Sequence, residues 1–242
     1  TSHSGIPLSG HKVVVKEGAR VAARQTLAVH HDLLTGDIHS PAAGSVEDIS
    51  PKAVVIAQDP PKPEDHLEDL PDGIDFDQVS NADLPRTLKE LGIDLAPLLT
   101  SCKTMVINAM SPEPPMSWTD LLLKEYDDLL EDGLELLRRL RPDADFILAA
   151  EKDKKNKAGV RLADLETVYL KPYYPNSLPP LVIREVCKAR GISEPETACL
   201  GLQQLYYLGF VAVYGLPLTE TIISAQLRSR VINIGTPAGD IF

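Results

Sequence analysis

Two nearly continuous apolar runs flank a long amphipathic segment in the second half of the chain. The runs are KTMVINAM at residues 103–110 and ADFILAA at residues 144–150. Between them, residues 117–140 carry leucines at helical spacing, and Pro142 follows as a stop signal. A strand that stays apolar along its length has both faces covered, and strands separated by helices pair in parallel. The sequence therefore predicts an α/β layer built on a parallel sheet.

The same alternation continues toward the C-terminus. Residues 167–172, TVYLKP, are expected to form a third strand. One helix is expected over residues 179–189, ended by Gly191, and another over roughly residues 195–213. We assign residues 86–215 to a Rossmann-like α/β domain.

The first 57 residues have a different pattern. Short apolar stretches alternate with turn residues such as Glu17-Gly18 and Thr35-Gly36. Many short strands joined by such turns indicate a compact all-β unit. The stretches VKEGARVAARQTLAV and SPAAGSVEDI in this part resemble the biotinyl/lipoyl barrel-sandwich domain. We assign residues 1–57 to a barrel-sandwich hybrid domain.

This resemblance also bears on chemistry. Carrier domains of that family hold a modified lysine at a hairpin tip, after an acidic pair of residues. In this chain the tip is HHDLLTGDIHSP, and the lysine position falls on or near Leu33, which has no amine to acylate. The resemblance therefore implies the barrel as a structural module without the swinging-arm chemistry.

Three histidines, His30, His31 and His39, lie close together in the same stretch. Imidazoles are common zinc ligands, so this group is a candidate metal site. Adjacent residues on a strand face opposite sides, however, so His30 and His31 would not easily share one ion. The sequence predicts no metal here.

Composition excludes several classes of protein. The net charge of −11 argues against nucleic acid as a partner, because phosphates favour Lys and Arg. No run of about eighteen apolar residues occurs, so no direct membrane span is expected, and the start of the chain does not resemble a signal peptide. Three scattered cysteines predict neither a disulfide framework nor a four-cysteine iron–sulfur cluster held by this chain alone.

Residues 58–85 differ from both flanking parts. They hold nine acidic residues and one lysine, with prolines spaced through the stretch. This composition predicts an acidic, Pro-rich linker with some polyproline II character. An acidic docking strip is the alternative.

Polar residues follow each of the three predicted strands. Asn108 and Glu113 follow the first, Glu151 the second, and Tyr174 and Asn176 the third. Ligands of open parallel sheets bind beyond the carboxyl ends of the strands, so we expect these residues to line one cofactor site. Prolines on both sides of Glu113 would hold its carboxylate ready for a ribose or a ring N–H. Equally, SPEPP would only end the strand and start a helix, with Glu113 near the helix N-terminus.

Four segments, taken in order, resemble a known family over nearly all of the chain. They are INAMSPEPP, KPYYPNSLPPLVI, GLPLTETIISAQ and RVINIGTPAGDIF. Together with the barrel they are similar to the C subunit of the Rnf electron-transport complex. They are also similar to the A subunit of the sodium-pumping NADH:quinone reductase and, more remotely, to the flavoprotein subunit of respiratory complex I.

The resemblance matches individual residues of this chain to positions in the family's motifs. In the Rnf pattern N-G-A-E-C-E-P, the matching places are held by Asn108, Glu113 and Pro114. Residues 174–176 match the start of the family's Y-P-x-G-x-E loop. The resemblance assigns residues 216–242 to the start of a β-grasp, SLBB-like segment.

The chain also departs from the family at the cofactor site. Flavin-binding members carry a loop G-x-G-G-A-G-F-P-T ahead of the first strand, where backbone N–H groups approach the phosphate and only glycine fits. Here that region is LPRTLKELGIDLAPLLTSCKT, with Gly92 as its only glycine. The Y-P loop also lacks the family's Gly and Glu. The resemblance therefore implies the fold and the complex, and leaves binding of FMN or NADH open, at a degenerate site.

Two functions are compatible with these features. The first is a soluble subunit of a membrane-associated electron-transport complex, cytoplasmic and peripheral to the inner membrane, with a degenerate flavin or NADH site. The alternative is a non-catalytic scaffold that binds no cofactor. Both predict other subunits of a membrane redox complex as partners. The apolar segment RVINIGTPAGDIF is expected to form an unpaired edge strand, which favours pairing with another chain.

Overall fold

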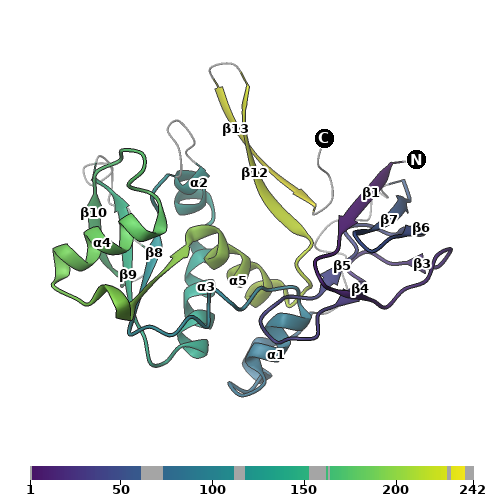
Figure 1. Ribbon diagram of the computed structural model, residues 1–242, viewed down its shortest axis with the longest axis horizontal. Helices are drawn as coiled ribbons and strands as arrows, with labels where there is room; N and C mark the ends of the chain where they lie inside the picture. Colours follow the sequence, from purple (N-terminus) through teal and green to yellow (C-terminus); the bar gives the residue numbers. More distant parts are fainter. Residues whose placement is uncertain are drawn as a thin grey trace. The chain divides into compact units, whose positions relative to one another are not determined.

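The computed structural model of the chain (Figure 1) contains two compact units. The described residues are 2–60, 73–111, 118–152, 162, 164–227 and 230–237, with the backbone alone for 220–237. The first unit holds residues 1–95, 214–223 and 235–242, and the second holds residues 96–213 and 224–234. The predicted combination of antiparallel strands with a separate parallel sheet is confirmed.

Two antiparallel sheets form the body of the first unit. The four-stranded sheet has the order β1 (His3–Pro7), β7 (Ala53–Gln58), β6 (Gly44–Ile49) and β3 (Arg20–Val21). The three-stranded sheet has the order β2 (Lys12–Val13), β4 (Thr26–Val29) and β5 (Ile38–His39). Side chains from both sheets, including Ile56 and Leu27, share one hydrophobic cluster. The all-β character expected for this part of the chain is confirmed.

Residues 73–95 belong to the first unit and are not a plain connector. They hold the 3-10 helix η2 (Phe76–Gln78) and helix α1 (Leu84–Glu90). The side chain of Phe76 is buried, so this stretch has an apolar anchor of its own. Residues 61–72 of the predicted acidic linker lie outside the described residues.

Helix α1 and the residues after it contact the loop between β4 and β5. Lys89 forms a buried ion pair with Asp37. The backbone N–H of Gly36 donates to the carboxylate of Asp94 at 2.9 Å. Both contacts lie within the first unit, which extends to Leu95, and the linker bounds of residues 58–85 stay a prediction.

A four-stranded parallel sheet is the centre of the second unit. Its order is β10 (Glu166–Leu170), β9 (Asp145–Glu151), β8 (Thr104–Asn108) and β11 (Thr197–Gly201). All three pairs of neighbouring strands are parallel. The three strands predicted from the sequence are confirmed.

Strand β11 corrects the sequence prediction, which placed residues 195–213 in one helix. Residues 197–201 pair instead with β8, so that Gly201 lies opposite Asn108. Helix α5 (Leu202–Tyr214) begins at the next residue. A five-residue apolar strand joined directly to a helix is too short for periodicity to separate the two elements.

A second correction concerns the helix predicted over residues 117–140. Its described part consists of two helices, α2 (Trp118–Glu125) and α3 (Asp127–Leu140). The break is at Tyr126, whose φ of −136° and ψ of 27° are not helical. The ring of Tyr126 packs edge-on against Tyr206, with centroids 5.4 Å apart. Two acidic residues then start α3, where they interact favourably with the helix dipole.

Helices cover both faces of the parallel sheet (Figure 1). Helix α4 (Pro179–Arg190) packs Val182 and Val186 against strand residues of one face. It ends at Gly191, in the left-handed conformation with φ of 67°, as predicted. Met105 in β8 is fully buried on the opposite face, because successive strand residues alternate in direction. Figure 1 shows α3 and α5 on that side of the sheet.

Helices α3 and α5 cross in backbone contact. A Cβ atom at Gly209 of α5 would overlap the carbonyl oxygen of Leu129. A Cβ atom at Gly133 of α3 would overlap the carbonyl oxygen of Leu205. Only glycine permits helices to approach this closely, so both positions fix the crossing.

The C-terminal segment forms a hairpin-like pair of strands. β12 (Glu220–Leu227) and β13 (Arg230–Pro237) make a two-stranded sheet. The expectation that this last apolar strand has no partner in the chain is therefore wrong, because β13 pairs with β12. The assignment of residues 216–242 to a β-grasp segment stays a prediction.

Candidate functional site

Asn108 ends β8 in the middle of the carboxyl edge of the parallel sheet, between β9 and β11. Its side-chain amide donates to the carbonyl oxygen of Ser177 at 2.9 Å. Its side-chain oxygen accepts from the backbone N–H of Met110 at 3.1 Å. Both ends of the amide therefore bind protein, and they tie the loop after β10 to the end of β8.

Glu151 ends the neighbouring strand β9 and is buried. Its carboxylate accepts from the backbone N–H of Ser111 at 2.9 Å. The hydroxyl of Ser111 lies 3.3 Å from that of Thr119, in the first turn of α2. The carboxylate thus helps to hold the chain segment that leaves β8.

The loop after β10 carries the remaining predicted residues that the structure describes. The ring of Tyr174 is 63% exposed, and that of Tyr173 is 67% exposed. Asn176 donates from its side-chain amide to the carbonyl oxygen of Lys171 at 3.2 Å, within the same loop. Among the predicted site residues that the structure describes, Tyr174 is therefore the one whose side chain is most available to a ligand.

The structure brings together only part of the predicted set. Asn108 and Glu151 lie on adjacent strands, and Asn108 reaches the loop of Tyr174 and Asn176 through one backbone contact. Glu113 lies outside the described residues. Its two interpretations, ligand-binding carboxylate or strand-to-helix device, therefore both stay predictions.

Ser111, Thr119 and Ser177 take part in this network, and the sequence reasoning did not select them. Ser177 is buried and lies two residues before Pro179, where α4 starts, and Leu178 holds the cap position. The Pro-Pro pair is a recognisable helix-start signal, and it could have drawn attention to this stretch. No comparable signal marks Ser111, because its partner Glu151 is forty positions away along the chain.

Gly92, the only glycine in the region where flavin-binding relatives carry a glycine loop, has a different use here. Its φ of 87° lies in the left-handed region, and its Cα faces the carbonyl oxygen of Asp37 and the ring of His39. The glycine therefore allows the turn after α1 to pack on the loop between β4 and β5. In the described residues of this region, the chain forms a helix and turns.

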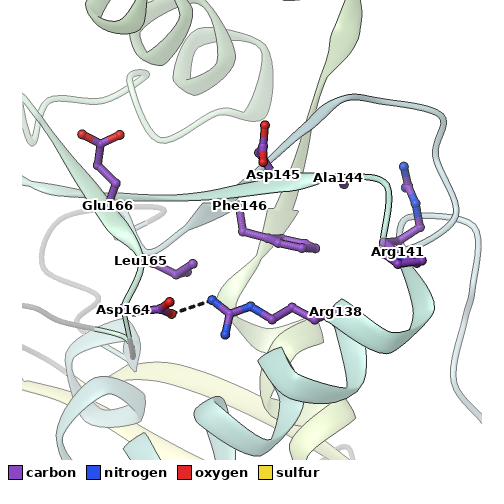
Figure 2. Close-up of a pocket in the computed structure, with 9 residues that line it drawn as sticks. Arg138, Arg141, Ala144, Asp145, Phe146, Asp164, Leu165 and Glu166 are labelled. Atoms are coloured by element: carbon purple, nitrogen blue, oxygen red, sulfur yellow. Dashed lines mark hydrogen bonds and ion pairs between the residues drawn. The ribbon is translucent and has the colours of Figure 1, made fainter.

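A cavity of about 370 Å³ lies at the opposite, amino edge of the sheet (Figure 2). Its lining residues are Arg138, Arg141, Pro142, Ala144, Asp145, Phe146, Asp164, Leu165 and Glu166. Figure 2 shows Arg138 reaching across to Asp164, which it contacts at 2.5 Å. This hydrogen-bonded guanidinium lowers the pKa of Asp164. The cavity is not at the edge where parallel sheets bind ligands.

Arg141, which also lines this cavity, uses its guanidinium for hydrogen bonds within the fold. Its guanidinium donates to the carbonyl oxygens of Leu98, Thr100 and Cys102 at 3.2, 2.6 and 3.0 Å. It also contacts the carboxylate of Asp143 at 3.1 Å and lowers its pKa. A cation with this many protein acceptors is a structural tie, because a buried guanidinium needs its donors satisfied.

Desolvation shifts the pKa values of Cys199 and His39. Burial raises the pKa of the Cys199 thiol to about 12, so this cysteine stays protonated and unreactive. Burial lowers the pKa of His39, against the opposing effect of the Asp37 carboxylate. Its Nδ1 has no hydrogen-bond partner among the residues that the structure describes. All three cysteines are free thiols, as expected.

The histidine loop corrects one premise of the sequence reasoning. His30 and His31 follow the last residue of β4, Val29, and lie in a bend. The alternation of side chains along a strand therefore does not apply to them, and their ring centroids are 4.5 Å apart.

Comparison with known proteins gives one consistent result. No protein-family model matches the chain. Among curated proteins, it is 25% identical over 175 residues to the C subunit of the ion-translocating oxidoreductase complex from two strains of Vibrio cholerae serotype O1. The corresponding protein of Haemophilus influenzae is 25% identical over 176 residues. The chain is thus distantly similar to the C subunit.

The similarity covers only part of each protein. The matches cover 62% of the chain, 22% of each Vibrio protein and 21% of the Haemophilus protein. The expected similarity to the C subunit is confirmed over this part of the chain, which is less than the nearly complete coverage that the sequence predicted. Among the described residues, no helix combines the length and the apolar character that crossing a membrane requires.

Proposed function

We propose that the chain is a soluble subunit of a membrane-associated electron-transport complex of the ion-translocating oxidoreductase kind. Similarity to the C subunit is the observation that carries this proposal. Its position would be cytoplasmic and peripheral to the inner membrane, and its partners would be other subunits of the complex. The net charge of −11 gives no reason to include nucleic acid among them.

The first unit would serve as a barrel-sandwich hybrid module with a structural role. Two antiparallel sheets that share one hydrophobic cluster support this assignment. At the tip of the loop between β4 and β5, Leu33 and Leu34 are exposed and carry no amine. A covalently attached carrier group is therefore not part of the proposal.

The second unit would keep the outline of a flavin or NADH site in degenerate form. Bound FMN or NADH would supply electron or hydride transfer. The exposed ring of Tyr174 offers a surface for stacking on such a ring system. The amide of Asn108 is committed to protein contacts, and Gly92 packs against protein. Neither residue therefore offers a backbone cradle for a phosphate, and we assign neither a step in electron transfer.

The alternative is a scaffold subunit of the same complex that binds no cofactor. The contacts of Asn108 and Glu151 favour it, because each side chain ties separate segments of the fold together. In this case the carboxyl edge of the sheet would be a packing device, and the partners would be held by surface contacts.

Titration with FMN and with NADH separates the two functions. The purified chain would be followed by flavin fluorescence and by calorimetry, beside Tyr174→Ala and Glu113→Ala. Glu47→Ala in β6 is a matched control, because that carboxylate is exposed and lies in the other unit. Micromolar binding that the site variants weaken would establish a retained cofactor site. Absence of binding up to millimolar ligand would establish the scaffold alternative.

Membership of the complex needs a separate test. The tagged chain would be isolated from detergent-solubilised membranes, and its partners identified by mass spectrometry. Recovery of subunits of a redox complex in constant proportion would support the proposal. A monomer in sedimentation, together with no redox subunit in the isolate, would overturn it whatever the cofactor titration gives.

A further inference from the structure

The loop between β4 and β5 brings two imidazoles and a carboxylate together. One ligand atom from each of His30, His31 and Asp32 lies within 4.8 Å of the others. The two rings are tilted by 35°, with centroids 4.5 Å apart. Consecutive residues can converge in this way because the chain bends directly after Val29.

His30 is held in place by its surroundings. Its side chain is 10% exposed, and its backbone N–H donates to the Asp37 carboxylate at 3.1 Å. The ring of His11 packs edge-on against it, with centroids 4.9 Å apart. His11 is itself fixed, because its two ring nitrogens lie 3.0 and 2.9 Å from the carbonyl oxygens of Ser9 and Gly36.

Asp32 is fixed as well. One carboxylate oxygen accepts the backbone N–H groups of Leu34 and Thr35, both at 2.9 Å. The other oxygen lies 3.0 Å from Nδ1 of His30. Two of the three polar side chains are thus positioned before any ligand arrives, which reduces the entropy lost on binding.

We propose that His30, His31 and Asp32 bind a divalent transition-metal ion of the zinc class. Two imidazoles and one carboxylate form an N,N,O donor set that suits Zn²⁺, and waters would complete the coordination. Neighbouring donors of a tetrahedral zinc site lie roughly 3.3 Å apart, given metal–ligand distances of about 2.0 Å. The exposed ring of His31 can rotate to close the remaining distance.

A bound ion would link the loop across its tip. His30 belongs to the packed base of the loop, whereas Asp32 holds the backbone of Leu34 and Thr35. The ion would therefore restrain the exposed tip of the loop at Leu33, and no covalent group would be attached there. This inference is independent of the proposed function, because it concerns residues of the first unit alone.

Calorimetric titration of the full chain, without a histidine tag, with ZnCl₂ and with MgCl₂ tests the site. We expect one Zn²⁺ per chain with micromolar affinity, no comparable uptake of Mg²⁺, and a higher melting temperature when zinc is present. His31→Ala and Asp32→Asn should each weaken zinc binding by at least about tenfold. His3→Ala is the matched control, because His3 also pairs with a carboxylate, Glu47, but lies in β1.

Cobalt substitution gives a second readout that does not depend on stability. Co²⁺ in the site should show the visible absorption of nitrogen and oxygen coordination, and the band should be lost in the double variant His31→Ala/Asp32→Asn. Circular dichroism would check that the exposed substitutions leave the fold intact. Equal zinc affinity in the double variant and in the wild type would overturn the proposal, as would weak binding without a defined stoichiometry.

Discussion

The two units use different chemistry at one close contact between their own segments. In the second unit, α3 and α5 meet backbone to backbone at Gly209, among apolar side chains. In the first unit, α1 meets the loop between β4 and β5 through the buried pair Lys89 and Asp37, and Gly92 brings the chain next to His39. A steric contact responds little to pH, whereas buried charges and imidazoles respond directly. The two contacts are therefore expected to fail under different conditions.

The largest effect is expected at the charged contact. Lys89→Met should lower the free energy of unfolding by about 3–5 kcal/mol, because it leaves the Asp37 carboxylate buried without its cation. The double variant Lys89→Met/Asp37→Asn should regain part of that loss, since the neutral amide needs no cation. Urea unfolding of the single and double variants measures both values.

The control for this experiment lies on the same helix. Arg86 and Glu90 form an exposed pair at 2.9 Å, and Arg86→Ala should cost no more than about 0.5 kcal/mol. If Lys89→Met cost as little as Arg86→Ala, burial would not distinguish the two pairs. The buried ion pair of the first unit would then stabilise the fold no more than an exposed pair does.

The steric contact should give the next largest effect. Gly209→Ala places a methyl group against the carbonyl oxygen of Leu129, which forces α5 and α3 apart. We expect a loss of about 2–3 kcal/mol that is the same at low and high salt. Gly5→Ala is the matched control, because a Cβ atom there meets no atom within 4 Å. A loss that changed with salt would contradict a purely steric origin.

The hydrogen bonds of Asn108 in the second unit are polar but uncharged, so they are neither a steric contact nor an ion pair. Asn108→Ala removes the hydrogen bonds to Ser177 and Met110, and should cost about 2 kcal/mol in urea unfolding. Asn176→Ala removes one hydrogen bond of an exposed loop and should cost clearly less. Equal, small losses would indicate that Asn108 is not a structural tie, and would favour its predicted role toward a ligand.

These ties show how far the sequence could predict the site. The positions of Asn108 and Glu151 follow from the rule that polar residues cluster at the carboxyl edge of a parallel sheet. Their hydrogen-bond partners do not follow, because Ser177 and Ser111 are brought near by loops whose course no local pattern encodes. The same rule cannot distinguish a side chain that binds ligand from one that binds backbone.

The elements of the fold also differ in whether the local sequence or a contact with a distant segment determines them. The buried strands β8 and β9 were predictable, because each is a long apolar run bounded by polar residues. Strand β11 was not, since only pairing with β8 distinguishes its five residues from the helix that follows. The break at Tyr126 was also hidden, because leucine spacing continues across it and the deciding contact, with Tyr206, comes from α5.

The smallest expected effect concerns His39. A change of pH alone should destabilise the first unit through this residue and leave the contact between α3 and α5 unaffected. Burial lowers the pKa of His39 in the folded chain, so the folded imidazole stays neutral when an unfolded histidine, with a pKa of about 6.5, takes up a proton. The associated stability is complete above the unfolded pKa and is lost as the pH falls toward the folded pKa. The unfolding free energy should therefore fall as the pH drops below about 6.5, the pKa of an unfolded histidine.

His39→Leu isolates this term, because leucine cannot take up a proton in either state. The unfolding free energy of the variant should depend less on pH than that of the wild type. Gly209→Ala should retain the wild-type slope, because this substitution changes no titrating group. A wild-type slope in His39→Leu would mean that other groups carry the pH dependence, and the first unit would then be no more sensitive to pH than the second.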